Sequence, residues 1–254
     1  MSQNFLHELA ELKPISLEQM SGIKLMNRLD NKYVANRTQL ARLLKMVKDS
    51  YFVQELNGKR ISPYRTVYFD TVGDTMYMDH HNGRADRIKV RVRTYEDSNL
   101  TFLEVKHKNN KGRTDKKRIK VDGIDHWNDV NECEQFVKKY AHVGIGDISA
   151  KLMNHFDRIT LVNYAKTERL TIDLNLQFDN SQNGCHKEMG DIVIIELKRD
   201  GHVYSPVRKY LYDLRIMPMG FSKYCIGRAV TDEHLKQNRF KTRIRTINKI
   251  KSKR

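Results

Sequence analysis

The sequence has 254 residues, a hydrophobic fraction of 39% and a formal net charge of +16. This length suits one large domain or two small ones, and the apolar fraction supports a core. No stretch approaches the roughly 20 apolar residues of a membrane-spanning helix, and residues 1–13 lack the pattern of a secretory signal. The charge excess predicts an anionic partner: nucleic acid, a membrane surface or a phosphorylated small molecule.

The three cysteines, Cys133, Cys185 and Cys225, lie far apart in the sequence and form no closely spaced pair. This pattern indicates a reducing, cytoplasmic environment and argues against a zinc site built from cysteines.

The C-terminal segment is strongly basic, with nine Lys or Arg and no acid from Lys236 to Arg254. We interpret residues 1–235 as a single domain and 236–254 as a basic tail. The tail is either a solvated or frayed end, or a segment that touches RNA or anionic lipid. The rest of the chain still carries +7, so the body of the protein is basic too.

Hydrophobic periodicity predicts a short helix over residues 4–13 and a second helix that Asn36 caps and that ends near Asp49. Beyond it, apolar and polar residues mainly alternate with the period of strands. We expect strands over 32–35, 51–56, 64–70, 87–95, 100–107, 114–121, 158–165, 169–177 and 191–198. We expect further helices over 131–141, 147–154 and 206–214.

Several of these strands have one apolar face and one face rich in basic residues. In the segment from Ile88 to Arg93, the apolar residues alternate with Lys89, Arg91 and Arg93. A solvated sheet face would explain the alternation in any one strand, but such faces usually mix charges. Neighbouring strands with like charges repel each other, so a repeated basic face indicates a bound polyanion. The other polar faces hold Glu104 and Lys106, then Lys116 and Arg118, then Arg169 and Asp173, then Glu196 and Lys198.

This pattern predicts an α+β fold in which an eight-stranded antiparallel β-barrel forms a tunnel with a basic interior, flanked by helices. The carboxylates Glu104, Asp173 and Glu196 either hold Mg²⁺ or Mn²⁺ or pair with neighbouring basic side chains. The chain has no GxxxxGK[ST] loop, so phosphate binding would depend on side chains. His80 and His81 precede the turn signal Asn82-Gly83 and favour surface or packing roles over metal binding.

Several segments together resemble the VTC (vacuolar transporter chaperone) polyphosphate polymerase domain, a branch of the CYTH-like triphosphate tunnel metalloenzymes. They occur in the order of that family over about residues 28–228. The segments are Asp30 to Val34, Tyr64 to Thr71, Lys89 to Arg93, Phe102 to Lys106, Lys116 to Arg118, Asp157-Arg158, Arg169 to Asp173, Ile195 to Lys198 and Phe221 to Tyr224.

The resemblance implies a metal-dependent transferase that moves the terminal phosphate of ATP onto a growing polyphosphate chain, with Mn²⁺ or Mg²⁺ as cofactor. It implies ATP and inorganic polyphosphate as partners and Glu196 as the metal ligand. A membrane-protein partner is a further expectation, with membrane association through that partner or the basic tail. The residues predicted to act in catalysis are Lys32, Arg91, Arg93, Lys106, Arg158 and Arg169. The same residues are predicted to bind phosphate together with Lys116, Arg118, Lys198 and Lys223.

The sequence departs from the family pattern at two places. The wider superfamily opens with an ExExK strand, whereas this chain reads Asp30-Asn31-Lys32 and lacks one acid. A second lysine that the family can carry before the Phe-Ser-Lys segment is replaced by Gly220. The first departure favours the polymerase branch over a simple triphosphatase or cyclase.

Two other functions remain open on the sequence alone. The tunnel could hydrolyse triphosphate or polyphosphate, or it could bind polyphosphate or nucleotide without turnover. Nucleic acid is disfavoured as a partner, because no base-stacking aromatic residues are interleaved with the basic strands.

Overall fold

The protein is described from a computed structural model, which covers residues 5–20, 28–128, 131–201 and 204–252. The described strands are β1 (Lys13–Ile15), β2 (Arg28–Asn36), β3 (Tyr51–Gln54), β4 (Ser62–Thr71), β5 (Arg87–Tyr95), β6 (Leu100–Lys108), β7 (Thr114–Val121), β8 (Ile148–Asn163), β9 (Glu168–Asn180), β10 (His186–Glu188) and β11 (Ile192–Asp200). The described α-helices are α1 (Phe5–Ala10), α2 (Arg37–Val47), α3 (Thr75–Asn82), α4 (Asn131–Ala141), α5 (Pro206–Asp213), α6 (Lys223–Thr231) and α7 (Lys241–Lys251).

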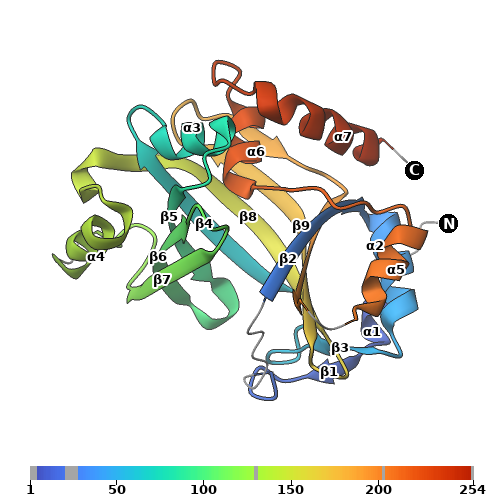
Figure 1. The fold of residues 1–254 in the computed structure, drawn as a ribbon. Helices are drawn as coiled ribbons and strands as arrows, with labels where there is room; N and C mark the ends of the chain where they lie inside the picture. Colours follow the sequence, from blue (N-terminus) through green and yellow to red (C-terminus); the bar gives the residue numbers. More distant parts are fainter. Residues whose placement is uncertain (1–4, 21–27, 129–130, 202–203, 253–254) are drawn as a thin grey trace.

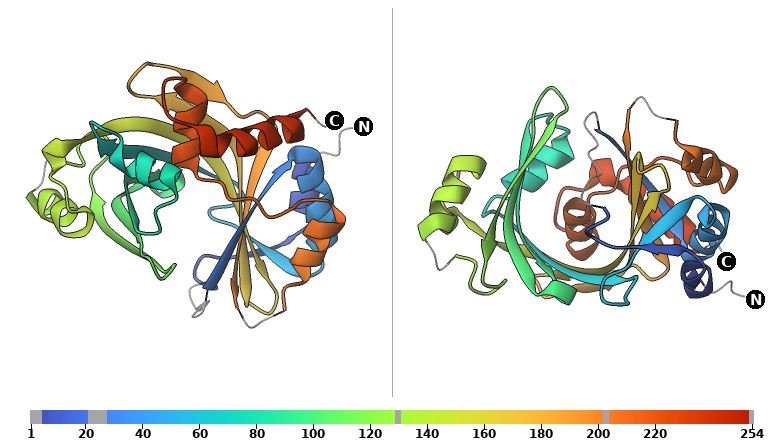
Figure 2. Two further views of the ribbon diagram at one scale, coloured as in Figure 1. Left: turned by 45° about the horizontal axis from the view of Figure 1, so that its top comes forward. Right: turned by 90° about the horizontal axis from the view of Figure 1, so that it is seen from below.

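The strands form one sheet whose main path runs β2-β11-β9-β8-β4-β5-β6-β7, with every neighbouring pair antiparallel. The sheet curls strongly, so that its two end strands turn toward each other (Figures 1 and 2). The predicted α+β fold with eight antiparallel strands is therefore confirmed. Within the described residues, no pairing joins β2 to β7, so the barrel is a curved sheet that remains open at this edge.

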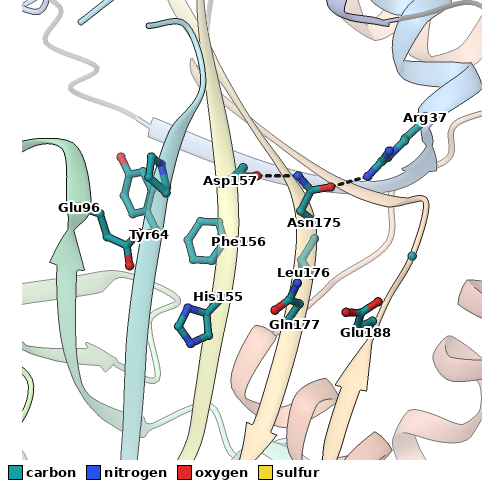
Figure 3. Close-up of a pocket in the computed structure, with 12 residues that line it drawn as sticks. Arg37, Tyr64, Glu96, His155, Phe156, Asp157, Asn175, Leu176, Gln177 and Glu188 are labelled. Atoms are coloured by element: carbon teal, nitrogen blue, oxygen red, sulfur yellow. Dashed lines mark hydrogen bonds between the residues drawn. The ribbon is translucent and has the colours of Figure 1, made fainter. Parts of the chain in front are cut away.

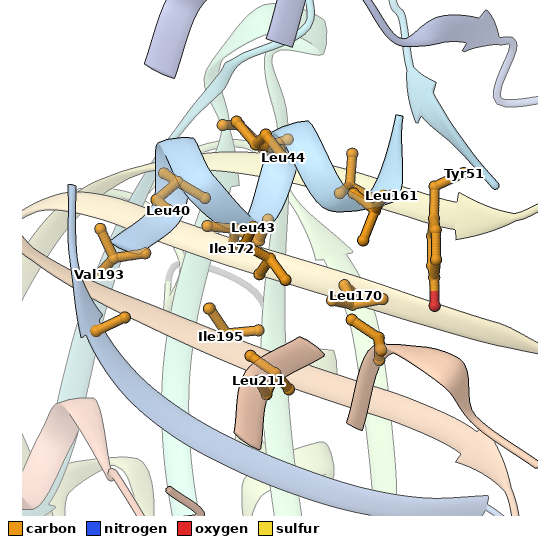
Figure 4. Packing of buried hydrophobic residues seen from close by; sticks show 14 of the residues in the cluster. Leu40, Leu43, Leu44, Tyr51, Leu161, Leu170, Ile172, Val193, Ile195 and Leu211 are labelled. Carbon is orange, nitrogen blue, oxygen red and sulfur yellow. The ribbon is translucent and has the colours of Figure 1, made fainter. Parts of the chain in front are cut away.

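Helices α1, α2 and α5 cover the convex face of β2, β11, β9 and β8. Asn36 caps α2 through a capping box with Gln39, which satisfies backbone donors at the start of the helix. The buried leucines of α2 face apolar residues of the strands (Figure 4). Burying one such leucine contributes roughly 1.5–3 kcal/mol, so this cluster fixes which face of the strands points outward. The labelled contacts in this cluster include Leu40, Leu43, Leu44, Ile172, Val193 and Ile195.

Helix α4 covers the convex face at the other end of the sheet. Its Phe136 and Val137 pack with Val90 and Val92 of β5 and Leu103 of β6. Because alternate residues of a strand point to opposite faces, this packing turns the basic residues of β5 toward the concave side.

Helix α6 lies against the concave side of the sheet, in the curve visible in Figure 2. Gly227 permits this close approach, because a Cβ there would lie 2.4 Å from Leu152 and 2.7 Å from Phe178. The first residue of α6, Lys223, is thereby carried into the tunnel.

Helix α7 packs against β2 and β11 and buries Ile247. The expectation of a frayed end is therefore wrong for Lys241–Lys251. This part of the basic segment is helical because its few apolar residues share one face that the sheet covers. No described helix has the length and apolar character needed to cross a membrane.

Two local predictions are corrected by the structure. The helix expected over 147–154 is wrong, because residues 148–154 form the first part of β8, where pairing with β4 and β9 outweighs helical periodicity. The alternation expected on β9 breaks at Asn175, which has a φ of 54°. Leu174 joins the convex cluster whereas Leu176 joins the concave one, so Asn175 leaves the polar inner face.

The buried carboxylate of Asp70 connects β4, α3 and α6. It accepts hydrogen bonds from the backbone N–H groups of Met76 and Tyr77 and from the hydroxyl of Tyr224. Tyr224 follows Lys223 directly, so Asp70 helps to place that lysine.

We expect Asp70→Asn to lower the free energy of unfolding by about 1.5–3 kcal/mol, because an amide nitrogen cannot accept the bonds that the carboxylate accepts. Urea unfolding monitored by circular dichroism would measure the change. The exposed Asp115→Asn variant is the matched control and should barely change the midpoint. Equal midpoints for the two variants would contradict this role of Asp70.

Candidate functional site

Strand register brings basic side chains into rows across the concave face. Lys89 of β5 pairs with Lys106 of β6, which in turn pairs with Lys116 of β7. We call these three residues the lysine row. Like charges directly opposite one another on neighbouring strands are destabilising, so the row is a place where an anion would relieve repulsion.

The next row along the tunnel contains one carboxylate and two close basic partners. Glu104 is almost fully buried, receives Arg91 at 2.6 Å and also contacts Lys116. Burial would raise the pKa of Glu104, but Arg91, Arg93 and Lys116 lower it to about 2. Glu104 is therefore ionised at neutral pH, and each of its two carboxylate oxygens contacts a basic side chain.

Arg158, Asp173 and Lys223 form a second buried ionic group. Arg158 donates to both oxygens of Asp173, at 2.6 and 2.9 Å, and Lys223 contacts the same carboxylate. Burial opposes ionisation of Asp173, yet Arg158 and Lys223 hold its pKa well below the ordinary value. The aromatic rings of Tyr64 and Phe156 lie beside the Arg158 guanidinium, at 4.9 and 5.3 Å.

Arg93 is buried between these two groups, with 6% of its surface exposed. It donates to the Thr66 hydroxyl at 3.0 Å and lies near the rings of Tyr64 and Phe156. Burial and the neighbouring Arg91 lower its pKa. Within the described part of the chain, no carboxylate forms an ion pair with Arg93, which leaves guanidinium donors for a ligand.

Glu196 faces the tunnel between two lysines. Lys198 contacts its carboxylate and Lys32 lies 3.8 Å away. Burial would raise the pKa of Glu196, but Lys32 and Lys198 lower it below its usual range. Across the sheet, Arg169 stands opposite Lys198 in the register. The paired strands thus bring Lys32, Arg169, Glu196 and Lys198 to one end of the tunnel.

Lys106 is a further inward cation without an acidic partner, because no ion pair involves it among the residues that the structure describes. Burial, followed by the charges of Lys32 and Arg91, lowers its pKa to about 7. Burial also lowers the pKa of Lys89 to about 8, although Lys89 donates to the Ser222 hydroxyl at 2.9 Å. Within the row, Lys106 therefore loses its proton most readily as pH rises through neutrality.

The lysine row opens into a cavity of about 280 Å³. Lys32, Lys89 and Lys106 line it together with Phe221 and Ser222, which precede α6. Lys32 is held there by a hydrogen bond to the Phe221 carbonyl at 3.1 Å. We call this cavity the tunnel mouth.

A different hollow lies where β4, β8 and β9 approach Arg37 (Figure 3). Asn175 connects its polar groups, donating to Asp157 and accepting from Arg37. Glu96 and Glu188 also line it, so acids and bases are mixed. This composition suits a polyanion less well than the tunnel does.

The structure places the predicted site residues on one concave surface, with one peripheral member. Arg118 is exposed on the edge strand β7, where its guanidinium lies 4.5 Å from the ring centre of Phe102. Lys89 is not among the residues predicted to bind phosphate, although its alternation with Arg91 and Arg93 places it on the basic face. No site role is predicted for Tyr64 or Phe156, because only the folded sheet brings their rings beside Arg158.

The described residues offer few side chains that could bind a metal ion. The described residues contain no group of three or more His, Cys, Asp or Glu side chains that could hold one. Glu104 and Asp173 are each occupied by two cations, whereas Glu196 has one close and one more distant lysine. Mg²⁺ often takes one or two carboxylates and completes its shell with substrate phosphates and water. The site fits an ion shared in that way.

Comparison with known proteins gives both a family and a fold. A sequence model described as the VTC domain matches residues 27–232. A candidate adenylate cyclase from Bacillus halodurans has a TM-score of 0.51 at 13% identity, covering 78% of this chain and 96% of that chain. A candidate adenylyl cyclase from Hippeastrum, described as having a dominant triphosphatase activity, has a TM-score of 0.51 at 14% identity, covering 80% and 96%. No curated protein sequence matches.

The low pKa of Lys106 predicts a pH dependence for the binding of inorganic triphosphate. A bound anion favours the ammonium form, so above about pH 7 binding must take up a proton and affinity falls as pH rises. One such proton changes affinity by up to about tenfold per pH unit. Calorimetric titrations from pH 6.5 to 9 would measure this fall.

Lys106→Met should flatten this profile while leaving the ionisation of the ligand unchanged. A weaker fall will persist through Lys89 and Lys223, whose pKa values burial lowers to about 8. Identical profiles for the two proteins would show that Lys106 does not titrate on binding.

Proposed function

Because the chain belongs to the VTC domain family, we propose that it is an ATP-dependent polyphosphate polymerase acting in the basic tunnel. The terminal phosphate of ATP is transferred to the end of a polyphosphate chain, and ADP is released. The observation that carries this proposal is the excess of cations on the concave face, where the half-buried Lys89 and Lys106 lie beside the buried Arg93. ATP and polyphosphate are the partners that this function requires.

The spacing of the cations supports a linear, uniformly charged ligand. Inward-facing residues on one strand are about 6.8 Å apart, twice the rise per residue of an antiparallel strand. Lys89, Arg91 and Arg93 therefore form a ladder along the tunnel, and Lys106 and Lys116 extend its first step sideways. A chain of phosphates can contact several of these groups at once, whereas a single anion cannot.

The buried arginines are suited to hold the reacting phosphates. Guanidinium groups donate two parallel hydrogen bonds to phosphate oxygens, and lysines act as mobile point charges. Arg158 is held rigidly by Asp173, and Arg91 by Glu104. In the transfer, the bond between the terminal phosphorus of ATP and its bridging oxygen breaks, while an oxygen at the chain end forms the new bond. Preorganised cations around this phosphorus would stabilise the charge on its oxygens.

The proposal includes a divalent cation, and Glu196 is the residue that would hold it together with phosphate oxygens. Such an ion neutralises phosphate charge and aligns the attacking and leaving oxygens. Lys198 and Lys32 keep Glu196 ionised, which an oxygen ligand for Mg²⁺ or Mn²⁺ requires.

A second candidate is hydrolysis, in which water replaces the chain end as acceptor. The similar fold of the Hippeastrum protein, described with triphosphatase activity, favours keeping this alternative. The same cations would bind the substrate in either reaction, so the two functions differ only in the acceptor.

The deciding experiment incubates the purified protein with ATP and Mn²⁺, with and without a short polyphosphate primer. ADP, free phosphate and polymer length are followed together. Polymer growth that matches ADP release is the expected result. Free phosphate without polymer would show hydrolysis in place of polymerisation. The absence of both products would contradict enzymatic function.

We expect Glu196→Gln to abolish metal-dependent turnover while metal-free binding of triphosphate becomes tighter. The substitution removes a negative charge and releases Lys32 and Lys198 for phosphate oxygens. Turnover and calorimetric affinity would be measured on the same preparation, and an unchanged far-UV spectrum would verify the fold. Glu188→Gln, on an exposed carboxylate of β10, is the control. Full activity of Glu196→Gln would exclude Glu196 as a metal ligand.

A further inference from the structure

The tunnel mouth continues onto the outer surface between α3, β5 and α7. A smaller cavity of about 200 Å³ adjoins it, and His80, Arg87 and Arg243 line both. The outer cavity is completed by His81, Gly83, Arg239 and Phe240. A basic surface therefore leads from the lysine row, past α3, to the start of α7.

Contacts with α3 hold the segment that leads into α7 in place. The backbone N–H of Arg239 donates to His81, and the Arg239 guanidinium donates to the carbonyl of Asn82. Gly83 has a φ of 78°, and a Cβ there would lie 2.6 Å from the Arg239 guanidinium. Arg239 lies in a short 3-10 helix (Asn238–Phe240) that leads into α7, and Arg243 of α7 lines the outer cavity with it.

The three residues that line both cavities carry charge and a polar atom that the described residues do not pair. In the part of the chain that the structure describes, no carboxylate forms an ion pair with Arg87 or Arg243. The Nδ1 atom of His80 is buried and has no hydrogen-bond partner there. A basic concave surface without acids concentrates anions, and the cavity supplies the space for one.

Building on the polymerase function proposed above, we propose that His80, Arg87 and Arg243 form an outer binding site for polyphosphate chains that extend beyond the tunnel. The inner end of this surface is the lysine row, so one linear anion can occupy both without a break. Arg243 lies on α7, outside residues 27–232 that the family model matches, whereas His80 and Arg87 lie within them.

The site predicts a dependence on chain length. We would measure the affinity of inorganic tripolyphosphate and of a long, defined-length polyphosphate by calorimetry for the full chain. Arg87→Ser/Arg243→Ser should weaken binding of the long chain about tenfold, as the loss of two exposed charged contacts would, and weaken binding of tripolyphosphate much less. Arg84→Ser/Arg245→Ser removes the same charge from the same two segments outside both cavities and is the matched control.

The outcomes separate this inference from the function on which it rests. If the wild type binds both ligands and the two double variants behave alike, the outer site is excluded while the tunnel proposal stands. If the wild type binds neither ligand, the tunnel proposal fails and the outer site fails with it. If Arg87→Ser/Arg243→Ser lowers the affinity for single-stranded RNA of matched length but leaves the polyphosphate affinity intact, the surface binds nucleic acid and the inference is overturned.

Discussion

Mutual repulsion among cations on the concave face is the constraint that the rest of the structure must balance. Lys89, Lys106 and Lys116 face each other across three strands, and Arg91 and Arg93 continue the charge along β5. Burial of the apolar convex faces under α2 and α4 offsets this repulsion. The same packing fixes which face of each strand points inward. A sheet that is apolar outside and basic inside is stable when its core outweighs the repulsion, and it gains further stability when an anion binds.

The few inward carboxylates determine which cations remain available. Glu104 and Asp173 each engage two basic side chains, which fixes Arg91 and Arg158 in defined positions. Lys106 and Arg93 have no such partner among the described residues and retain donors for a ligand. Ion pairing therefore holds some cations in a fixed orientation and leaves others without an acidic partner in the described part of the chain. The first kind can position a phosphate, and the second kind can still bind one.

Helix α6 connects the core to this site. Asp70 holds Tyr224 and the start of α3, Gly227 lets α6 approach β8 and β9, and Lys223 then contacts Asp173. The same arrangement seats α3 beside the start of α7. Packing of apolar and aromatic residues in one cluster therefore sets the position of cations at both the centre and the mouth of the tunnel.

The sequence by itself determined the basic faces, because alternation along a strand depends only on its period of two. Arg91, Arg93, Lys106, Lys116 and Glu196 were placed on the inner face in this way, and the family resemblance added Lys32, Arg158 and Lys223. Alternation fails at Asn175, because one residue with positive φ exchanges the faces of β9. It also could not distinguish a helix from a strand over 147–154, where pairing with β4 and β9 decided the outcome.

Only the tertiary structure decided how the cations are distributed and where the sheet stays open. The pairs Arg91–Glu104 and Arg158–Asp173 join residues on different strands, so their existence depends on register. The burial that lowers the pKa of Lys106 depends on the whole curved sheet. The position of α7, which brings Arg243 to the tunnel mouth, depends on its packing against β2 and β11. It also depends on contacts of the preceding residue Arg239 with α3, about 160 residues away along the chain. Local sequence patterns record the period of an element, whereas these features arise from contacts between distant ones.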